Sequence, residues 1–401
     1  MKTMNDRDVV LPIFWNDRDV VLPIFLNDRD VVLPVFGNDR DVVLPVFWND
    51  RDVVLPIFWN DRDVVLPEVL LMYTIKPEKL EEILKSFQNR RIIVLGDIML
   101  DEYLWGKVQR ISPEAPVPII EVNSTDYRLG GAANVAMNLS ALNAKVDLVG
   151  VCGKDAQAEI IIELLKKREM SAAGIFFDPS RPTTLKTRIG SVSQQIVRLD
   201  REDVTEIDTN IRKQIFNYLA KIMPLCDALL IEDYNKGLLS FNLITDVLQL
   251  ALKYKKMVAV DPKYLNFSSY GGVEIFKPNF RELESYLGSK FTDQDDFERS
   301  AEELRQRMSI KHLVVTKGSE GMYLFSENKP VKHLPSFARE VFDVSGAGDT
   351  VISALTLAYL YNRQIETAAL IANHSAAVAV AKKGTVSVTI EEIWESFNAP
   401  N

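Results

Sequence analysis

The chain has 401 residues, of which 47% are hydrophobic and 26% charged, and its formal net charge is −9. This balance is typical of a globular protein, and the negative charge argues against an extended nucleic-acid-binding surface. No apolar run approaches the roughly 20 residues of a membrane span, and the N-terminus lacks a secretory signal, so we expect neither a nucleic-acid nor a membrane partner. Cys152 and Cys226 form no disulfide or metal-binding pattern, which favours a reducing, cytoplasmic environment.

Residues 5–67 form an 11-residue repeat, Asn-Asp-Arg-Asp-Val-Val-Leu-Pro, followed by Ile or Val, then Phe, and in most copies Trp. The recurring proline excludes a continuous coiled coil, because proline interrupts a helix. Short Val-Val-Leu strands are possible, but few turn residues separate them. We predict that residues 1–71 are weakly ordered and outside the functional protein, with Met72 as its start. The alternative is an adhesive or assembly-promoting arm.

After Met72 the sequence alternates between strand-like and helical segments. Residues 72–89 include an amphipathic helix that starts at Pro77, and residues 91–96 are an apolar run ending at a glycine, as in buried parallel strands. Further strands are expected at 145–150, 227–231, 258–261 and 312–316, and helices near 155–169, 240–253, 347–361 and 364–382. The alternation predicts an α/β fold with a mostly parallel, doubly wound sheet and ligands at the carboxyl ends of its strands.

Two segments depart from this alternation. Residues 117–122 and 183–199 read as β segments without intervening helices. We therefore predict one domain over residues 90–398 that carries a small antiparallel β lid, at about 115–128 and 183–200.

The sharpest local motif is Asp-Val-Ser-Gly-Ala-Gly-Asp-Thr at residues 343–350, which leads directly into an apolar helix. Small residues let the backbone approach a ligand, and amides at a helix N-terminus attract anions. We expect Gly346, Ala347 and Gly348 to stabilise a phosphoryl group during transfer, and Asp349 to accept the proton of the attacking hydroxyl. A tight turn with an acidic helix start is the alternative for this motif taken alone. No Gly-Lys-Ser/Thr follows, so it is not a Walker A loop.

Together with other motifs, this pattern resembles the ribokinase-like (PfkB) family of carbohydrate kinases. The other motifs are, in chain order, Gly96-Asp97 with Asp101, Gly130-Gly131-Ala132-Ala133-Asn134, Asp233, Asp261-Pro262-Lys263, Asn279-Phe280-Arg281-Glu282, Thr316–Gly321 and Ala372-Asn373. The resemblance runs from about residue 90 to 397. It implies a three-layer ribokinase-like fold, a phosphotransferase that acts on a sugar hydroxyl, ATP and Mg²⁺ as cofactors, and a homodimer.

Longer stretches narrow the resemblance to family members that phosphorylate D-glycero-β-D-manno-heptose 7-phosphate. They are residues 96–106, 110–118, 129–138, 194–200, 233–237 and 346–351. The implied product is the 1,7-bisphosphate, a precursor of ADP-heptose and the lipopolysaccharide core. Many such enzymes continue into a nucleotidyltransferase domain, whereas this chain ends after the kinase, so a separate nucleotidyltransferase is expected. The alternatives are another sugar or nucleoside kinase, and a non-catalytic sugar- or nucleotide-sensing protein on the same scaffold.

The remaining site residues are expected in three groups. Sugar hydroxyls should meet Asp97 and Asp101, which follow the first strand, and also Gly130, Gly131 and Asn134. A phosphate already on the sugar needs cations, and the candidates are Lys186, Arg188 and Arg198 of the lid, with Arg110 and Arg128 nearby; positions 186 and 188 share a strand face. The resemblance assigns the nucleotide to Lys263, Asn279, Glu282, Thr316, Gly318, Gly321 and Asn373, with Glu282 organising Mg²⁺ through water. Plain structural roles, such as helix starts and solvated charges, are the alternative for each of them.

Removing residues 1–71 tests the proposed division of the chain. Because the repeat is expected to lie outside the kinase domain, a chain that starts at Met72 should keep its turnover in an ADP-release assay. Loss of activity would contradict the division, and loss of self-association would favour the adhesive arm.

Overall fold

The computed structural model divides the chain into two compact units, Met1–Lys76 and Pro77–Asn401. It describes residues 24–26, 43–48, 51–60, 63–65, 75–191, 195–382, 384 and 386–398. In the first unit, β1 (Ile24–Leu26), β2 (Val43–Trp48), β3 (Arg51–Asn60) and β4 (Asp63–Val65) form one sheet in that order. The other repeat residues lie outside the described ones, and the weak order predicted for residues 1–71 stays a prediction.

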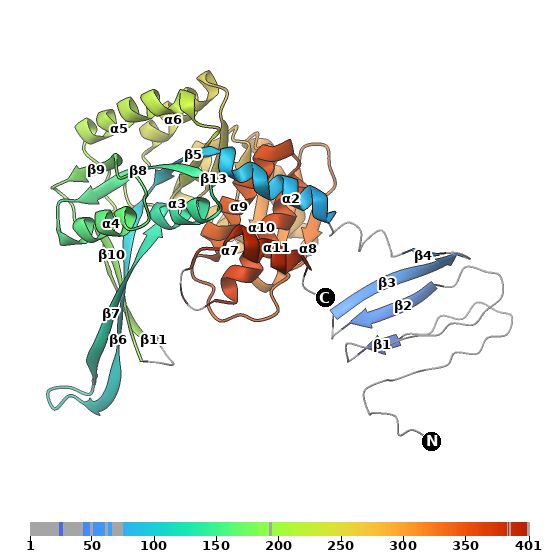
Figure 1. Ribbon diagram of the computed structural model, residues 1–401, viewed down its shortest axis with the longest axis horizontal. Helices are drawn as coiled ribbons and strands as arrows, with labels where there is room; N and C mark the ends of the chain where they lie inside the picture. The colour runs from blue at the N-terminus through green and yellow to red at the C-terminus, as the bar shows by residue number, and fades with distance from the viewer. Residues whose placement is uncertain are drawn as a thin grey trace. The chain divides into compact units, whose positions relative to one another are not determined.

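The second unit is built on a nine-stranded sheet with the order β17-β16-β15-β14-β13-β12-β5-β8-β9 (Figure 1). The strands from β9 to β15 run parallel, while β16 and β17 are antiparallel additions at one edge. Their bounds are β5 Arg91–Gly96, β8 Lys145–Gly153, β9 Gly174–Asp178, β12 Ala228–Glu232, β13 Met257–Asp261, β14 Ile275–Phe276, β15 His312–Thr316, β16 Met322–Ser326 and β17 Lys332–Leu334. The central strands are buried on both faces, as their unbroken apolar runs predicted.

Helices cover both faces of this sheet, which makes three layers. One face packs against α5 (Thr209–Ile222), α6 (Phe241–Lys253), α7 (Phe280–Leu287) and α8 (Gln294–Arg307) in a core that includes Ile93 and Leu95 of β5. The layer on the other face contains α3 (Ala132–Ala141), α9 (Ala347–Asn362) and α10 (Ile365–Val380). The other helices are α2 Pro77–Ser86, α4 Ala156–Lys166 and α11 Ile390–Asn398. The doubly wound α/β fold predicted from the alternation is therefore confirmed.

No helix in the described part of the chain is long and apolar enough to cross a membrane.

A second, four-stranded sheet, which we call the lid, has the order β11-β10-β6-β7. Its strands are β6 (Ile98–Ile111), β7 (Pro118–Gly131), β10 (Thr184–Gly190) and β11 (Gln195–Arg201). Strand β6, which was not predicted from the sequence, continues from β5 after the single residue Asp97 and pairs in parallel with β10. The lid is thus mixed rather than antiparallel, because a strand of the main sheet runs straight on into it.

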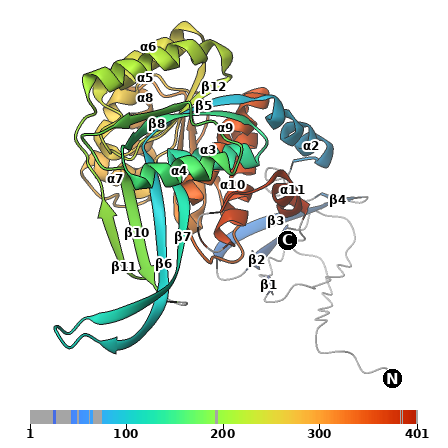
Figure 2. The same ribbon diagram turned by 60° about the vertical axis from the view of Figure 1, so that its left-hand side comes forward.

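The hairpin of β6 and β7 extends further than the adjacent strands β10 and β11. The last residue of β10, Gly190, pairs with Trp105, whereas β6 and β7 stay paired as far as Ile111 and Pro118. Figure 2 shows this two-stranded arm extending past the ends of β10 and β11.

Candidate active site

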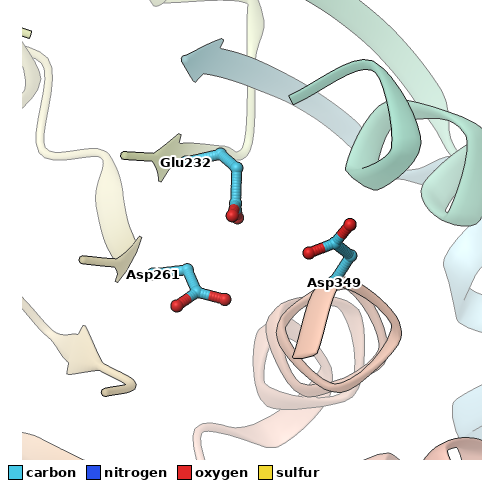
Figure 3. Close-up of side chains that lie close together, drawn as sticks. All are labelled: Glu232, Asp261 and Asp349. Carbon is cyan, nitrogen blue, oxygen red and sulfur yellow. The ribbon is translucent and has the colours of Figure 1, made fainter. Parts of the chain in front are cut away.

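Three buried carboxylates meet where two strands end and one helix begins. Glu232 ends β12, Asp261 ends β13 and Asp349 lies in the first turn of α9. Their nearest oxygens all lie within 4.8 Å of one another, and Figure 3 shows the three side chains converging. Neighbouring parallel strands end at the same edge of a sheet, which explains how residues so far apart in sequence meet.

Asp349 is held by two donors. Its carboxylate accepts hydrogen bonds from Asn134 Nδ2 at 2.5 Å and from Tyr234 Oη at 3.2 Å. Burial raises the pKa of Asp349 to about 6, with a smaller rise from the charge of Asp261, and the bond from Asn134 and the charge of Lys277 counteract it. A carboxylate with this pKa is ionised at neutral pH and is still basic enough to accept a proton.

The loop before α9 turns at Gly346, whose φ of 78° favours glycine. Gly348, in the first turn, faces a buried cation, because a Cβ built on it would lie 3.6 Å from Lys277 Nζ. That Nζ also pairs with Asp261 Oδ2 at 2.7 Å. A helix N-terminus beside a buried lysine is an environment that stabilises negative charge. Lys277 was not predicted from the sequence as a site residue, although it directly follows the short strand β14.

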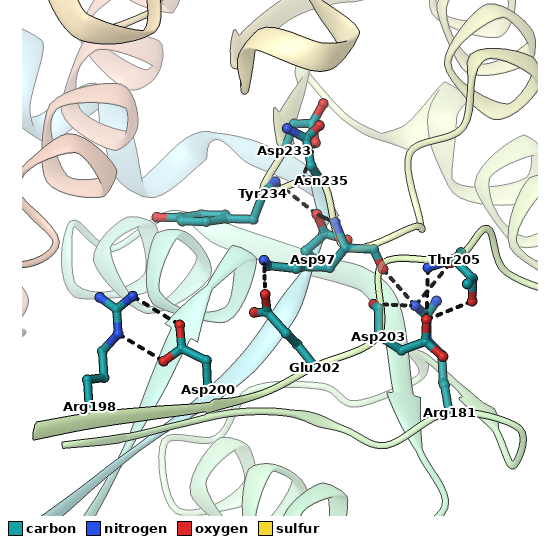
Figure 4. A network of polar contacts seen from close by, with 11 residues as sticks. Asp97, Arg181, Arg198, Asp200, Glu202, Asp203, Thr205, Asp233, Tyr234 and Asn235 are labelled. Carbon is teal, nitrogen blue, oxygen red and sulfur yellow. Dashed lines mark hydrogen bonds and ion pairs between the residues drawn. The ribbon is translucent and has the colours of Figure 1, made fainter. Parts of the chain in front are cut away.

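Asp97 joins the site to the loop after β12. Its Oδ2 accepts a hydrogen bond from the amide of Tyr234 at 2.8 Å (Figure 4) and another from the amide of Lys236 at 3.1 Å. Burial, and then the charge of Asp233, raise the pKa of Asp97 to about 6. One oxygen of this predicted sugar ligand is therefore already engaged in shaping the loop. Asp233 is fixed in turn by Tyr270 Oη at 2.7 Å.

The loop held by Asp97 places Tyr234 at the centre of the site. The Nζ atoms of Lys186 and Lys263 lie 5.3 and 5.0 Å from the centroid of its ring. Tyr234 has no role predicted from the sequence, since nothing in the local pattern places this tyrosine against Asp349.

The lid face that carries Lys186 bears both acidic and basic side chains. Strand register aligns two rows across β11, β10, β6 and β7: Asp200, Lys186, Asp101, Arg128, and then Arg198, Arg188, Tyr103, Asp126. Each arginine pairs with an aspartate of these rows: Arg188 with Asp101 at 2.5 Å, Arg198 with Asp200 at 2.8 Å and Arg128 with Asp126 at 2.8 Å.

Lys186 differs from these arginines. It forms no ion pair among the residues that the structure describes, and burial lowers its pKa. Of the three cations predicted for the lid, Lys186, Arg188 and Arg198, Lys186 is thus the one that no aspartate pairs with among the described residues. Arg110 is exposed on the arm of the lid.

Two of the expected nucleotide residues form a helix cap. Asn279 Oδ1 accepts from the amide of Glu282 at 2.9 Å, and Glu282 Oε2 accepts from the amide of Asn279 at 2.9 Å, which is a capping box at the start of α7. The other oxygen of Glu282 pairs with Lys263. Both carboxylate oxygens of Glu282 are therefore engaged, which suits the indirect, water-mediated role expected for it. Oxygen ligands of the kind that Mg²⁺ prefers also converge in the three-carboxylate cluster.

The remaining expected nucleotide residues differ in their surroundings. Thr316 is bridged to Asn279, so its loop adjoins the start of α7. Gly318 has open space around its Cβ position, whereas a Cβ on Gly321 would lie 2.1 Å from the carbonyl oxygen of Leu334. The first glycine thus leaves room for a ligand, and the second is required by close packing.

On α10, Asn373 Nδ2 donates to the carbonyl oxygen of Pro335 at 2.7 Å. The ring of His374 stacks against Phe337 and Phe397, with centroid distances of 4.3 and 3.7 Å. Burial lowers the pKa of His374 to about 4, so this histidine is a neutral packing residue.

This chain is similar to known proteins in both its sequence and its fold. Residues 89–392 match the model of the "pfkB family carbohydrate kinase". The "Bifunctional protein HldE" of Helicobacter pylori strain J99 is 41% identical over 304 residues, and that of Pelobacter propionicus is 40% identical over 316 residues. These alignments cover 76% and 79% of this chain but only 65% of each relative, so the chain spans about two thirds of their length.

Among solved structures, Escherichia coli phosphofructokinase-2 in complex with substrates and products has a TM-score of 0.65, at 18% identity, over 77% of this chain and 98% of its own. Arabidopsis thaliana ribokinase complexed with ribose and ATP has a TM-score of 0.61, also at 18% identity, over 78% of this chain and 99% of its own. At this identity the likeness shows a shared fold.

The position of Asp349 generates a prediction about proton transfer. Asp349→Asn keeps the shape of the side chain but cannot accept a proton, so we expect turnover to fall by about two to four orders of magnitude with little change in ATP binding. In the unsubstituted protein, turnover should rise with pH as Asp349 ionises near pH 6 and then level off. Stopped assays from pH 5 to 8 measure both effects. Unchanged turnover in the variant would remove Asp349 from the role of base.

Proposed function

Because the chain belongs to the pfkB family of carbohydrate kinases, we propose that it transfers the γ-phosphoryl group of ATP to the anomeric hydroxyl of D-glycero-β-D-manno-heptose 7-phosphate. The product would be the 1,7-bisphosphate, in the synthesis of ADP-heptose for the lipopolysaccharide core. The observation that carries the kinase chemistry is Asp349, a buried carboxylate at the start of a helix, held between Asn134 and Tyr234. The choice of sugar is supported by relatives at 40–41% identity named HldE.

In this mechanism Asp349 accepts the proton of the sugar hydroxyl as its oxygen bonds to the γ-phosphorus, and the bond to ADP breaks. The amides of Gly346, Ala347 and Gly348 stabilise the charge on the transferring group, with Lys277 beside them. Bound Mg²⁺ would neutralise phosphate charge, and the residues that would hold it are Glu282, through water, and Glu232 and Asp261 of the carboxylate cluster.

The lid would recognise the phosphate that the sugar already carries. Lys186 faces Tyr234 and forms no ion pair among the described residues, whereas Arg188 and Arg198 each have an aspartate partner. A phosphate gives Lys186 the anion that the fold does not supply. Asp101, Gly130, Gly131 and Asn134 would contact the sugar itself. The backbone of Gly130 lies close to Asp101, because a Cβ built on Gly130 would be 2.7 Å from the Asp101 carboxylate, so the two residues can contact the same sugar.

The proposed use of ATP also bears on where the enzyme acts in the cell. ATP as donor implies a cytoplasmic enzyme, and the free, buried thiols of Cys152 and Cys226 are compatible with that location. The relatives are named bifunctional, and the alignments cover about two thirds of their length. We therefore propose that the nucleotidyltransferase step of the pathway needs a region or protein other than the one described here. A kinase for another phosphosugar is the alternative that the same site would allow.

A substrate panel with one lid variant tests the choice of sugar. Lys186→Met removes the proposed phosphate contact, so KM for heptose 7-phosphate should rise about 10- to 100-fold, as for loss of a charged hydrogen bond, while KM for ATP changes little. The exposed lid residue Lys107 offers the control Lys107→Met, which should behave as the unsubstituted protein. Equal turnover of ribose, fructose and heptose 7-phosphate would refute the specific substrate and leave the kinase assignment standing.

The lid arm also supports a homodimer. A two-stranded ribbon is marginally stable on its own, yet the arm carries several exposed apolar side chains. They are Val108, Ile111, Val117 and Val122, each 43–61% exposed. We propose that a second copy of the chain covers them.

Light scattering of the purified chain tests this association. Ile111→Asp should shift a dimer toward the 45.4 kDa monomer, because it places a charge in the proposed contact. Phe241→Asp, on the exposed side of α6, should leave the mass unchanged. A monomeric unsubstituted chain would contradict the proposal.

A further inference from the structure

A cavity of about 570 Å³ lies beside α3 and away from the carboxylates of the active site. Its walls come from β7, the middle of α3, the turn after α4 and the segment between α10 and α11. On α3 it is lined by Met137, Ser140 and Ala141, whereas Asn134 of the same helix bonds to Asp349. Of the residues predicted for sugar, nucleotide or catalysis, the cavity lining contains Arg128, which pairs with Asp126 rather than facing the active site.

The charged groups of the cavity favour an anion. Arg128 on β7 and Arg168 after α4 both line it, and its acidic lining residue is Asp126. Arg128 Nε pairs with Asp126 at 2.8 Å, and the guanidinium lies 4.8 Å from the centroid of the Tyr103 ring. Its Nη1 is buried and has no hydrogen-bond partner in the described part of the chain. Two guanidinium groups against one carboxylate leave a net positive charge among the lining residues.

The rest of the lining sets the size and character of the ligand. Met137, Ala141, Met170 and Val386 supply apolar surface, and Ser140 and Ser387 supply hydroxyl groups. The volume falls within the roughly 300–1,000 Å³ of small-molecule sites. Arginine is well suited to phosphate, because its planar guanidinium can donate two parallel hydrogen bonds. A phosphate ester with a small organic group matches this combination better than a purely apolar molecule does.

We propose that this cavity is a second ligand site, which binds a small phosphate ester through Arg128 and Arg168. A ligand there would contact segments that lead into both glycine motifs of the active site. Arg128 precedes Gly130 by two residues on β7. On the other wall, a Cβ built on Gly384 would lie 1.8 Å from Arg128 Nη1, so this glycine packs directly over the guanidinium.

Gly384 connects that wall to the catalytic loop. Its amide donates to Asp343 Oδ2 at 3.1 Å, and Asp343 Oδ1 accepts from the amide of Ser345 at 2.9 Å, immediately before Gly346. Occupancy of the cavity thus has a direct structural route to the residues around the transferring phosphoryl group.

Calorimetric titration of phenyl phosphate into the full chain, saturated with a non-hydrolysable ATP analogue and Mg²⁺, tests the site. Phenyl phosphate offers one phosphate ester and an apolar ring, and the analogue blocks the nucleotide site. We expect one equivalent to bind per chain. Arg168→Glu should weaken binding at least tenfold, and Ser140→Trp should abolish it by filling the cavity. Lys166→Glu, which makes the same charge change outside the cavity lining, should bind as the unsubstituted chain does.

Two further titrations separate this site from the active site and from free phosphate. Lys186→Met should bind phenyl phosphate normally, and loss of binding there would place the ligand in the sugar site and overturn the proposal. Inorganic phosphate should bind more weakly than phenyl phosphate, and equal affinity would overturn the assignment to an ester. Unaltered binding by Arg168→Glu, with turnover and circular dichroism unchanged, would also refute it. None of these outcomes depends on which sugar the kinase phosphorylates.

Discussion

The active site depends on how few positive charges face its buried acids. Glu232, Asp261 and Asp349 lie within 4.8 Å of one another, and Lys277 is the cation that pairs directly with one of them, Asp261. Burial raises the pKa of Glu232 well above its ordinary value, and the charges of Asp261 and Asp349 add to that rise. Like charges so close together in a poorly solvated site cannot all be ionised at low cost. The three carboxyl groups therefore favour a state in which at least one of them holds a proton.

Two kinds of element hold these acids in place. Parallel strands deliver Glu232 and Asp261 to one edge of the sheet, and the start of α9 presents Asp349 from the opposite side. The loop after β12 completes the site, because Asp97 binds its amides and so fixes Tyr234 against Asp349. A substitution in this loop would therefore alter the position of Tyr234 and the hydrogen bond to Asp349, even if the substituted residue contacts no ligand.

The contribution of the lid to ligand binding depends on which of its cations form ion pairs within the sheet, rather than on its net charge. Arg128, Arg188 and Arg198 each pair with an aspartate of the same sheet, so these three cations are already neutralised within the lid. Lys186 is left facing Tyr234, and Arg128, which lines the second cavity, has one buried nitrogen without a partner in the described part of the chain. Strand register thus decides which cations meet a ligand, and the same four strands would serve two different phosphate groups.

The sequence by itself determined the alternation of strands and helices, the glycine motif before Asp349 and the family, because these are written in local patterns and in the order of motifs. It did not reveal Lys277 or Tyr234, whose roles come from contacts with residues far away in the chain. It also did not reveal β6, because the polar and apolar residues of this segment lack the pattern typical of a strand. It also treated Lys186, Arg188 and Arg198 as equivalent cations. Only the tertiary structure separates them, since an ion pair across strands depends on register, and register is set by the packing of the whole lid.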